Sequence, residues 1–185
     1  MKLSTEQDIL DLISADPWMM EVLRVVEKLN LPNCWIGAGF VRNTVWDALF
    51  DTPVRTPLDD VDVVFFDSKD QSGERETKLE HELAAKMPEI KWSVTNQARM
   101  AKIKGDAPYL STKDALAAWP ETATAVSVRL TGVELELLAP HGIKDMIGGI
   151  VRPTPIFSRK EEQFAARQAK KNWKSKWPNL ILPRF

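Results

Sequence analysis

Pro57-Leu-Asp-Asp-Val-Asp-Val-Val-Phe-Phe-Asp67 combines four carboxylates with a run of apolar β-forming residues, and this run predicts a strand. Side chains alternate along a strand, so Asp60 and Asp62 should leave the same face about 7 Å apart. Two neighbouring carboxylates repel and are costly to bury unpaired, whereas a hard divalent cation neutralises them and prefers oxygen ligands. The pattern therefore favours a metal site at Asp60 and Asp62, with a solvated edge strand as the alternative. Asp59 should end the preceding loop, and Asp67 should end the strand in a structural role.

A second chemical signal lies about twenty residues earlier. Cys34-Trp-Ile36 predicts a short strand, Gly37-Ala-Gly39 a turn, and Phe40 to Phe50 a helix. A strand, a glycine turn and a helix start present free backbone N–H groups at the positive end of the helix dipole, which suits a phosphate. The alternative is a tight turn without a ligand. The spacing is not the dinucleotide fingerprint, because Arg42 stands where its third glycine would fall.

The runs 124–130 and 133–138 alternate in polarity around Thr131-Gly132, which predicts a β-hairpin. Pairing outward from that turn sets these residues opposite one another: Leu130 and Val133, Arg129 and Glu134, Val128 and Leu135, Ser127 and Glu136.

This register gives Glu134 a cross-strand cation, Arg129, and leaves Glu136 without one. A metal site at Asp60 and Asp62 would need a third carboxylate on a neighbouring strand, so Glu136 is the candidate and Glu134 the reserve. The alternative is that both glutamates face water.

Periodicity and capping residues predict the remaining elements. The first helix should be capped by Ser4 with Gln7, and the last by Ser158 with Glu161. A basic run on the last helix could bind phosphate or nucleic acid, but a solvated helix face is the commoner reading. The predicted helices span 4–14, 17–29, 74–87, 111–119, 143–147 and 158–174. A strand is predicted over 91–96, and the basic segment 97–110 is expected to be irregular. Trp173, Trp177 and Leu180 should dock the tail on the body of the protein.

Bulk composition describes an ordinary globular protein of 185 residues, 44% hydrophobic and 28% charged, with net charge −1. One domain over 1–185 is expected, with a core of about 30–150 and a helical tail of about 156–185. A single cysteine, Cys34, excludes an internal disulfide framework and a cysteine zinc cluster. No apolar run is long enough for a membrane span, and the polar start is no signal peptide, so we expect a cytoplasmic protein without a membrane partner.

Several motifs together resemble the small bacterial nucleotidyltransferase family proteins of the polymerase-β-like nucleotidyltransferase superfamily. The resemblance covers nearly the whole chain and rests on Gly-Ala-Gly-Phe-Val-Arg-Asn43 with Val-Trp-Asp47, the 58–67 strand, Trp-Ser-Val-Thr-Asn-Gln-Ala-Arg-Met100, Ala-Pro-His-Gly-Ile-Lys-Asp145 and Trp-Pro-Asn-Leu180. It implies an α/β (α+β) fold: a small mixed sheet flanked by helices, with further helices at both ends.

The resemblance also implies a chemistry: transfer of a nucleoside monophosphate from an NTP to a hydroxyl acceptor, with two Mg²⁺ ions, or Mn²⁺. By matching position, Asp60, Asp62 and Glu136 would be the catalytic metal ligands. The implied nucleotide-binding residues are Gly37, Ala38, Gly39, Arg42, Asn43 and Arg99, although Arg99 could equally form a surface salt bridge.

Two departures from the superfamily pattern stand out. The turn is Gly-Ala-Gly, so it offers a phosphate no serine hydroxyl, and the third carboxylate is a longer Glu. The acceptor could be a small molecule, a short RNA end or a protein. An alternative is a catalytically inactive regulator that binds nucleotide or metal, such as a toxin–antitoxin component; a phosphohydrolase is disfavoured because the His-Asp metal pair is missing.

Overall fold

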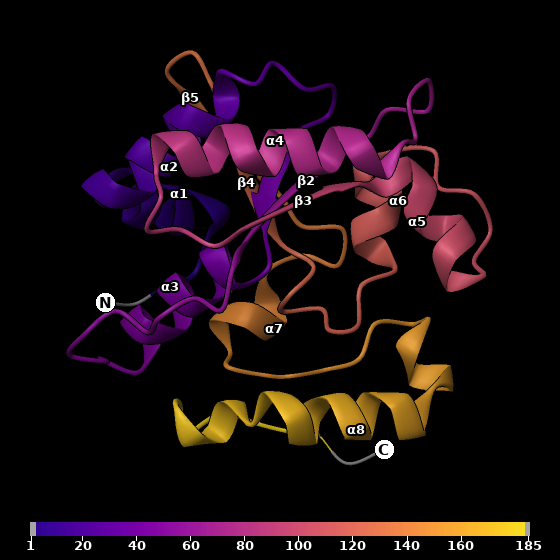
Figure 1. The fold of residues 1–185 in the computed structure, drawn as a ribbon. Coiled ribbons are helices and arrows are strands. Elements are labelled where there is room, and N and C mark those ends of the chain that lie inside the picture. The colour runs from indigo at the N-terminus through magenta and orange to yellow at the C-terminus, as the bar shows by residue number, and fades with distance from the viewer. Residues whose placement is uncertain (1–2, 184–185) are drawn as a thin grey trace.

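A five-stranded mixed sheet forms the centre of the protein in a computed structural model that describes residues 3–183. The strand order is β3-β2-β1-β4-β5, and only β2 and β3 are parallel. Figure 1 shows α4 crossing in front of the strands, with α7 and α8 below them. The strands are β1 (Trp35–Gly37), β2 (Val61–Phe65), β3 (Trp92–Asn96), β4 (Ser127–Thr131) and β5 (Glu134–Leu138).

Helices surround this sheet, which confirms the predicted α/β architecture. None of the helices within residues 3–183 is long and apolar enough to cross a membrane. The helices are α1 (Glu6–Ser14), α2 (Pro17–Glu27), α3 (Gly39–Leu49), α4 (Gly73–Lys86), α5 (Gln97–Lys104), α6 (Thr112–Ala117), α7 (Lys144–Ile147) and α8 (Glu161–Lys171), with short 3-10 turns η1 (Phe157–Arg159) and η2 (Trp173–Ser175).

The two faces of the sheet differ in how they are covered. Val61, Val63 and Phe65 of β2 point into the main core, together with apolar residues of α1 to α4. The opposite face carries a smaller apolar cluster in which Val64 packs with Leu116 of α6. Asp62 belongs to this second face because it alternates with Val61 and Val63. A polar, accessible site can therefore form there without breaking the main core.

The hairpin forms as predicted, but the predicted register is wrong. Its turn is Gly132-Val133, which brings Thr131 opposite Glu134 and Arg129 opposite Glu136. Gly132 has φ of +63°, a conformation that glycine adopts without strain and that suits a two-residue hairpin. The shift moves Val133 from the predicted core face into the exposed turn, and it moves the cation Arg129 from Glu134 to Glu136.

Three predictions about helices are also wrong. The first helix is capped by Thr5, whose side chain accepts a hydrogen bond from the N–H of Asp8. The first part of the segment 97–110 is not irregular: Asn96 caps α5, which ends at Lys104 with Gly105 as its C-cap. The last helix starts at Glu161, because Ser158 lies in η1 and donates its hydroxyl to the carbonyl of Pro155.

The tail docks through tryptophans, as predicted. Trp173, Trp177 and Leu180 are buried in the main core. Both indoles pack edge-on against Trp46 of α3, at ring-centre distances of 5.5 and 5.1 Å. The indole N–H of Trp177 also donates to Asp47 Oδ1 at 2.9 Å. The C-terminal residues are thereby fixed against the helix that follows the glycine turn.

Candidate active site

A pocket of about 380 Å³ opens where β2, α3 and α8 meet. Six of its residues belong to the predicted turn, helix start and carboxylate motif: Ala38, Gly39, Arg42, Asn43, Asp60 and Asp62. The remaining wall comes from the loop before β2, from α5, from the segment between α6 and β4, and from the C-terminal residues: Pro57, Leu58, Asp59, Lys104, Trp119, Pro120, Thr124, Arg167, Lys171, Trp173, Lys176 and Trp177.

The carboxylates stand on one wall of this pocket. Asp62 pairs with Gly37 across β1 and β2, and Asp60 directly precedes the strand. Burial raises the pKa of Asp62 to about 6, the nearby Asp60 carboxylate adds to the rise, and a hydrogen bond with Ser93 opposes it. Within residues 3–183, no ion pair joins Asp60 or Asp62 to a cation. The two carboxylates thus form a strained like-charged pair, as expected for a site that takes up positive charge.

The turn before α3 brings backbone donors to the same pocket. No side chain caps this helix, so the N–H groups of its first turn remain available for an anion. Gly39 lines the pocket, whereas Gly37 does not. A Cβ on Gly37 would lie 3.2 Å from both Ser127 Cβ and the Trp119 ring, so that glycine is required for close packing.

Ala38 occupies a backbone conformation that disfavours side chains, with φ of +53° and ψ of −121°. Ala38→Gly should relieve this strain and raise the free energy of unfolding by about 1 kcal/mol, after the larger unfolded-state entropy of glycine is subtracted. Urea denaturation would measure the change. The same substitution at the exposed Ala166, inside α8, should lower the free energy by about 1 kcal/mol; a loss at both positions would contradict the expected strain.

Arg42 forms the inner wall of the pocket and is itself buried. Its guanidinium lies 4.5 Å from the ring centre of Trp173 and donates to Thr124 Oγ1 at 3.2 Å and to Asn43 Oδ1 at 2.8 Å. Burial lowers the pKa of Arg42 to about 10, and the carboxylate of Glu121 opposes the shift most strongly. Arg42 therefore stays charged at neutral pH and faces the pocket from a fixed position.

The sequence did not single out the cations that α8 adds. Arg167 and Lys171 lie one turn apart on α8 and both line the pocket, together with Lys176 beyond the helix and Lys104 of α5. The sequence places Arg167 and Lys171 at helical spacing after Phe164, which is buried, so the three residues fall on one side of the helix. Their position could not be read from it, because α8 meets the carboxylate loop across more than a hundred residues.

The structure does not bring Glu136 or Glu134 to the pocket, since neither is among its lining residues. β5 is the edge strand and is separated from β2 by β1 and β4. Glu136 accepts two hydrogen bonds from Arg129, at 2.7 and 2.8 Å, and this pair lowers its pKa. The expectation that Glu136 lacked a cross-strand cation came from the incorrect register.

Arg99 also lies away from the pocket lining. Its guanidinium donates to both oxygens of Glu76, including a bond of 2.7 Å to Oε1, and the same oxygen accepts the backbone N–H of Asn96. Arg99 thus ties α5 to α4.

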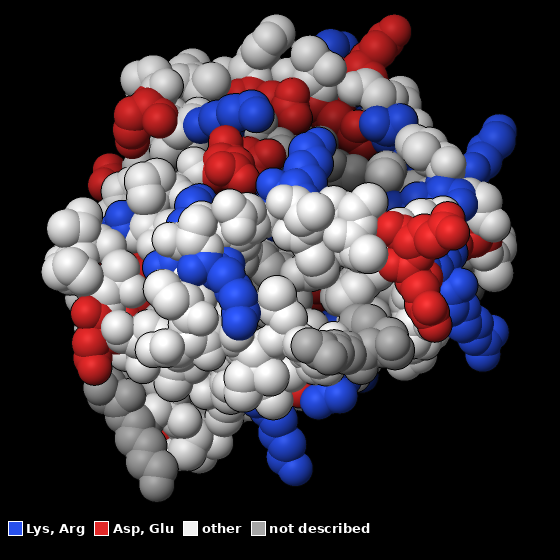
Figure 2. Space-filling view, turned by 90° about the horizontal axis from the view of Figure 1, so that it is seen from below, with Lys and Arg blue, Asp and Glu red and all other residues white. Residues whose placement is uncertain are grey.

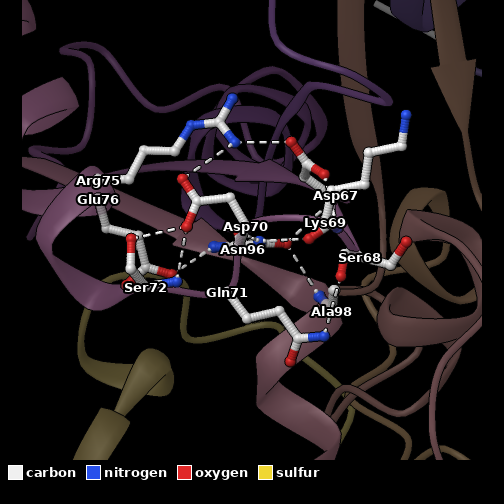
Figure 3. Close-up of polar contacts among 10 residues, drawn as sticks. All are labelled: Asp67, Ser68, Lys69, Asp70, Gln71, Ser72, Arg75, Glu76, Asn96 and Ala98. Carbon is white, nitrogen blue, oxygen red and sulfur yellow. Dashed lines mark hydrogen bonds and ion pairs between the residues drawn. The ribbon is translucent and has the colours of Figure 1, made fainter.

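Figure 3 shows the polar cluster around Asn96, where the parallel strands β2 and β3 end. The amide group of Asn96 donates to the carbonyls of Asp67 and Asp70, at 2.8 and 2.7 Å, and accepts the N–H groups of Asp67 and Ala98. Arg75 donates to the Asp67 carboxylate at 2.6 Å. Asp67 therefore takes part in holding the loop before α4.

The surface below the sheet carries charges of both signs. Figure 2 shows this side of the molecule, with Lys and Arg side chains interspersed with Asp and Glu around a largely neutral middle. No broad basic field covers this side, so an anionic ligand would be held by cations of the pocket itself.

The comparisons with known proteins agree with this fold. A family model described as "Nucleotidyltransferase" matches residues 24–182. The chain belongs to the nucleotidyltransferase family. A solution NMR structure said to reveal a CCA-adding enzyme head domain is 37% identical, with a TM-score of 0.87 over 99% of this chain and 98% of that chain. No curated protein matches the sequence.

Longer enzymes share the fold of this nucleotidyltransferase at lower identity. A CCA-adding enzyme in an apo form is 15% identical, with a TM-score of 0.58 over 95% of this chain and 42% of that one. A tRNA nucleotidyltransferase complexed with a primer tRNA and an incoming ATP analogue is 20% identical, with a TM-score of 0.55 over 88% and 46%. The chain therefore spans less than half the length of these two enzymes.

Proposed function

We propose that this nucleotidyltransferase moves a nucleoside monophosphate from an NTP to a hydroxyl acceptor in a metal-dependent reaction at the 380 Å³ pocket. One observation carries the proposal. Two carboxylates that form no ion pair within residues 3–183, Asp60 and Asp62, share a small pocket with the uncapped start of α3 and with Arg42. The two carboxylates suit divalent cations, and the start of α3 together with Arg42 suits phosphate.

The donor set fits Mg²⁺ in particular. Among residues 3–183, no three or more His, Cys, Asp or Glu side chains gather as a metal site. Mg²⁺ is commonly held by one or two carboxylates together with substrate phosphates and water, and Asp60 and Asp62 can provide that share. When bound, two such ions would neutralise phosphate oxygens and lower the pKa of the acceptor hydroxyl. The raised pKa of the Asp62 carboxyl is the response expected of a ligand pair without its cation.

The protein groups would act mainly by positioning and by charge. N–H groups of the α3 first turn, which starts at Gly39 after Ala38, would bind phosphate oxygens. Arg42 would stabilise negative charge on the leaving pyrophosphate, and Asn43 would keep its guanidinium oriented. We leave Glu136 and Arg99 outside the proposed site, because each is paired elsewhere.

The acceptor is proposed as the hydroxyl of an RNA end or of a small molecule. The solved relatives include an enzyme crystallised with primer tRNA, which makes an RNA 3′ end the first candidate to test. The mixed charges in Figure 2 favour a short end held locally over a long duplex. An NTP-consuming reaction fits the cytoplasmic location predicted from the sequence.

Ligand-dependent thermal stability tests the binding half of this proposal. With Mg²⁺ or Mn²⁺ present and NTP at a hundred times its dissociation constant, linkage adds about 2.7 kcal/mol, or a few degrees in Tm. We expect this shift to vanish with a chelator and in Asp60→Asn. An NTP shift that survives both changes would contradict the metal site. Pyrophosphate release with RNA and metabolite acceptors tests turnover, and metal-dependent binding without any release would favour the regulatory alternative.

A further inference from the structure

The segment 160–177, here called the C-terminal segment, supplies five of the residues that line the pocket. Lys160 lies 4.0 Å from Asp106 at its start, Arg167 pairs with Glu121 in its middle, and Lys171 with Asp59 near its end. Figure 1 shows α8 running across the bottom of the molecule. The segment is therefore one wall of the proposed site.

The two cations that α8 presents to the pocket are held in different ways. Arg167 donates to both oxygens of Glu121, at 2.6 and 3.1 Å, and the side chain of Glu121 has no solvent exposure. Gln168 donates to the same carboxylate at 3.1 Å. Breaking a buried pair of this kind leaves an uncompensated charge, so Arg167 should stay in place when a ligand enters.

Lys171 is held loosely by comparison. Its ammonium lies 3.3 Å from Asp59 Oδ2, and the Asp59 side chain is 68% exposed. Exposed ion pairs of this type contribute roughly 0–1 kcal/mol. A multiply charged anion in the pocket can therefore take Lys171 from Asp59 at little cost, while the released carboxylate is solvated by water.

We propose that Arg167 and Lys171 form a polyphosphate clamp on α8, in which Arg167 is fixed by Glu121 and Lys171 exchanges Asp59 for a ligand phosphate. The clamp rests on the proposed function, because it recognises the triphosphate of the NTP. It faces the carboxylate wall that carries Asp59, Asp60 and Asp62. Affinity should depend on the phosphate chain and little on the base.

Titration calorimetry with Mg²⁺ and three probes tests the clamp: a non-hydrolysable ATP analogue, inorganic tripolyphosphate and AMP. Lys171→Gln should weaken the binding of the analogue and of tripolyphosphate about tenfold, and it should change the binding of AMP by no more than about twofold. The matched control is Lys170→Gln, which removes the same charge from the next position, outside the pocket lining, and should change neither. Equal losses in the two variants would mean a general charge effect and would overturn the clamp.

Asp59→Asn should change the affinity for tripolyphosphate in the opposite direction. Removing the competing carboxylate should tighten tripolyphosphate binding about two- to fivefold, whereas a structural salt bridge would give no gain. A loss of affinity as large as that in Asp60→Asn would indicate that Asp59 binds the metal. That result would overturn the proposed exchange of Lys171 from Asp59 to a ligand phosphate.

Arg167→Lys keeps the charge but not the two-point contact with Glu121, and it should weaken tripolyphosphate several-fold. Unchanged binding in a variant that melts like the wild type would remove Arg167 from the clamp. Failure of the proposed function looks different: wild-type protein would then bind neither the ATP analogue nor tripolyphosphate in a metal-dependent way.

Discussion

Asp62→Asn is expected to lower nucleotidyl transfer about a thousandfold while making the metal-free protein more stable. The loss follows because an amide is a weak ligand for a hard cation and leaves only one of the two proposed metal ligands, Asp60, as a carboxylate. The gain follows because the variant removes a buried charge beside a like charge. Turnover measured as pyrophosphate release, and urea denaturation in the presence of a chelator, would check the two effects.

The stability difference should depend on pH in a defined direction. The pKa of Asp62 is raised from 3.8 to about 6 in the folded state. Below about pH 3 the carboxyl is protonated in both states and does not change stability. As pH rises, the unfolded state loses its proton first, so wild-type stability falls relative to the variant. Above about pH 7 the difference is constant, on the order of 1–3 kcal/mol.

Asp67→Asn is the matched control, because Asp67 follows the same strand but lies outside the pocket. Its pKa is lowered, chiefly by the hydrogen bond from Arg75, so this substitution should reduce stability above the folded-state pKa and leave turnover largely intact. If Asp62→Asn destabilises the metal-free protein at pH 8, or if both variants lose turnover equally, the assignment of Asp62 is wrong.

Trp177→Ala should cost about 3–5 kcal/mol of the free energy of unfolding and abolish nucleotide binding. The indole is 1% exposed, packs on Trp46 and donates to Asp47, and the deletion would leave a large cavity beside the pocket. Asp47 also accepts the backbone N–H and the hydroxyl of Thr56, at 2.7 and 2.6 Å, so it joins α3 and the loop before β2 to the tail. Urea denaturation and the metal-dependent NTP shift would measure both losses.

Trp177→Phe separates the two contributions of the indole. It keeps an aromatic ring against Trp46 but removes the N–H donor, so about 1–3 kcal/mol should be lost. Lys174→Ala, at an exposed position nearby, should change stability by no more than about 0.5 kcal/mol. A small effect of Trp177→Ala would show that the tail is not an integral part of the pocket wall.

Features specified within a few residues could be predicted from the sequence. The strand around Asp60 and Asp62, the glycine turn and the start of α3 each follow from local periodicity and backbone preference. The hairpin register could not be fixed in this way, because choosing Thr131-Gly132 or Gly132-Val133 as the turn leaves every strand residue on the same face and changes only the position of Val133. That choice alone decided whether Glu136 had a cation partner.

Contacts between distant segments lay beyond such reasoning. Arg167 and Lys171 read as part of a solvated basic helix, and only their contacts with Glu121 and Asp59 place them in the pocket. Arg99 was a candidate nucleotide contact with a surface salt bridge as the equal alternative, and the structure pairs it with Glu76. Charge and spacing in the sequence indicate which residues could bind a ligand, and tertiary contacts determine which of them lie in the pocket.

The pocket also has a consequence for the order of events during folding. Lys171 meets Asp59 across 112 residues and Trp177 meets Asp47 across 130, so the C-terminal residues join the pocket through contacts of high sequence separation. Contacts of high sequence separation form late, because a long loop must first be closed. Competence to bind a nucleotide should therefore appear only with the slowest step of refolding. A bound nucleotide would in turn stabilise these contacts and slow the detachment of the C-terminal residues during unfolding.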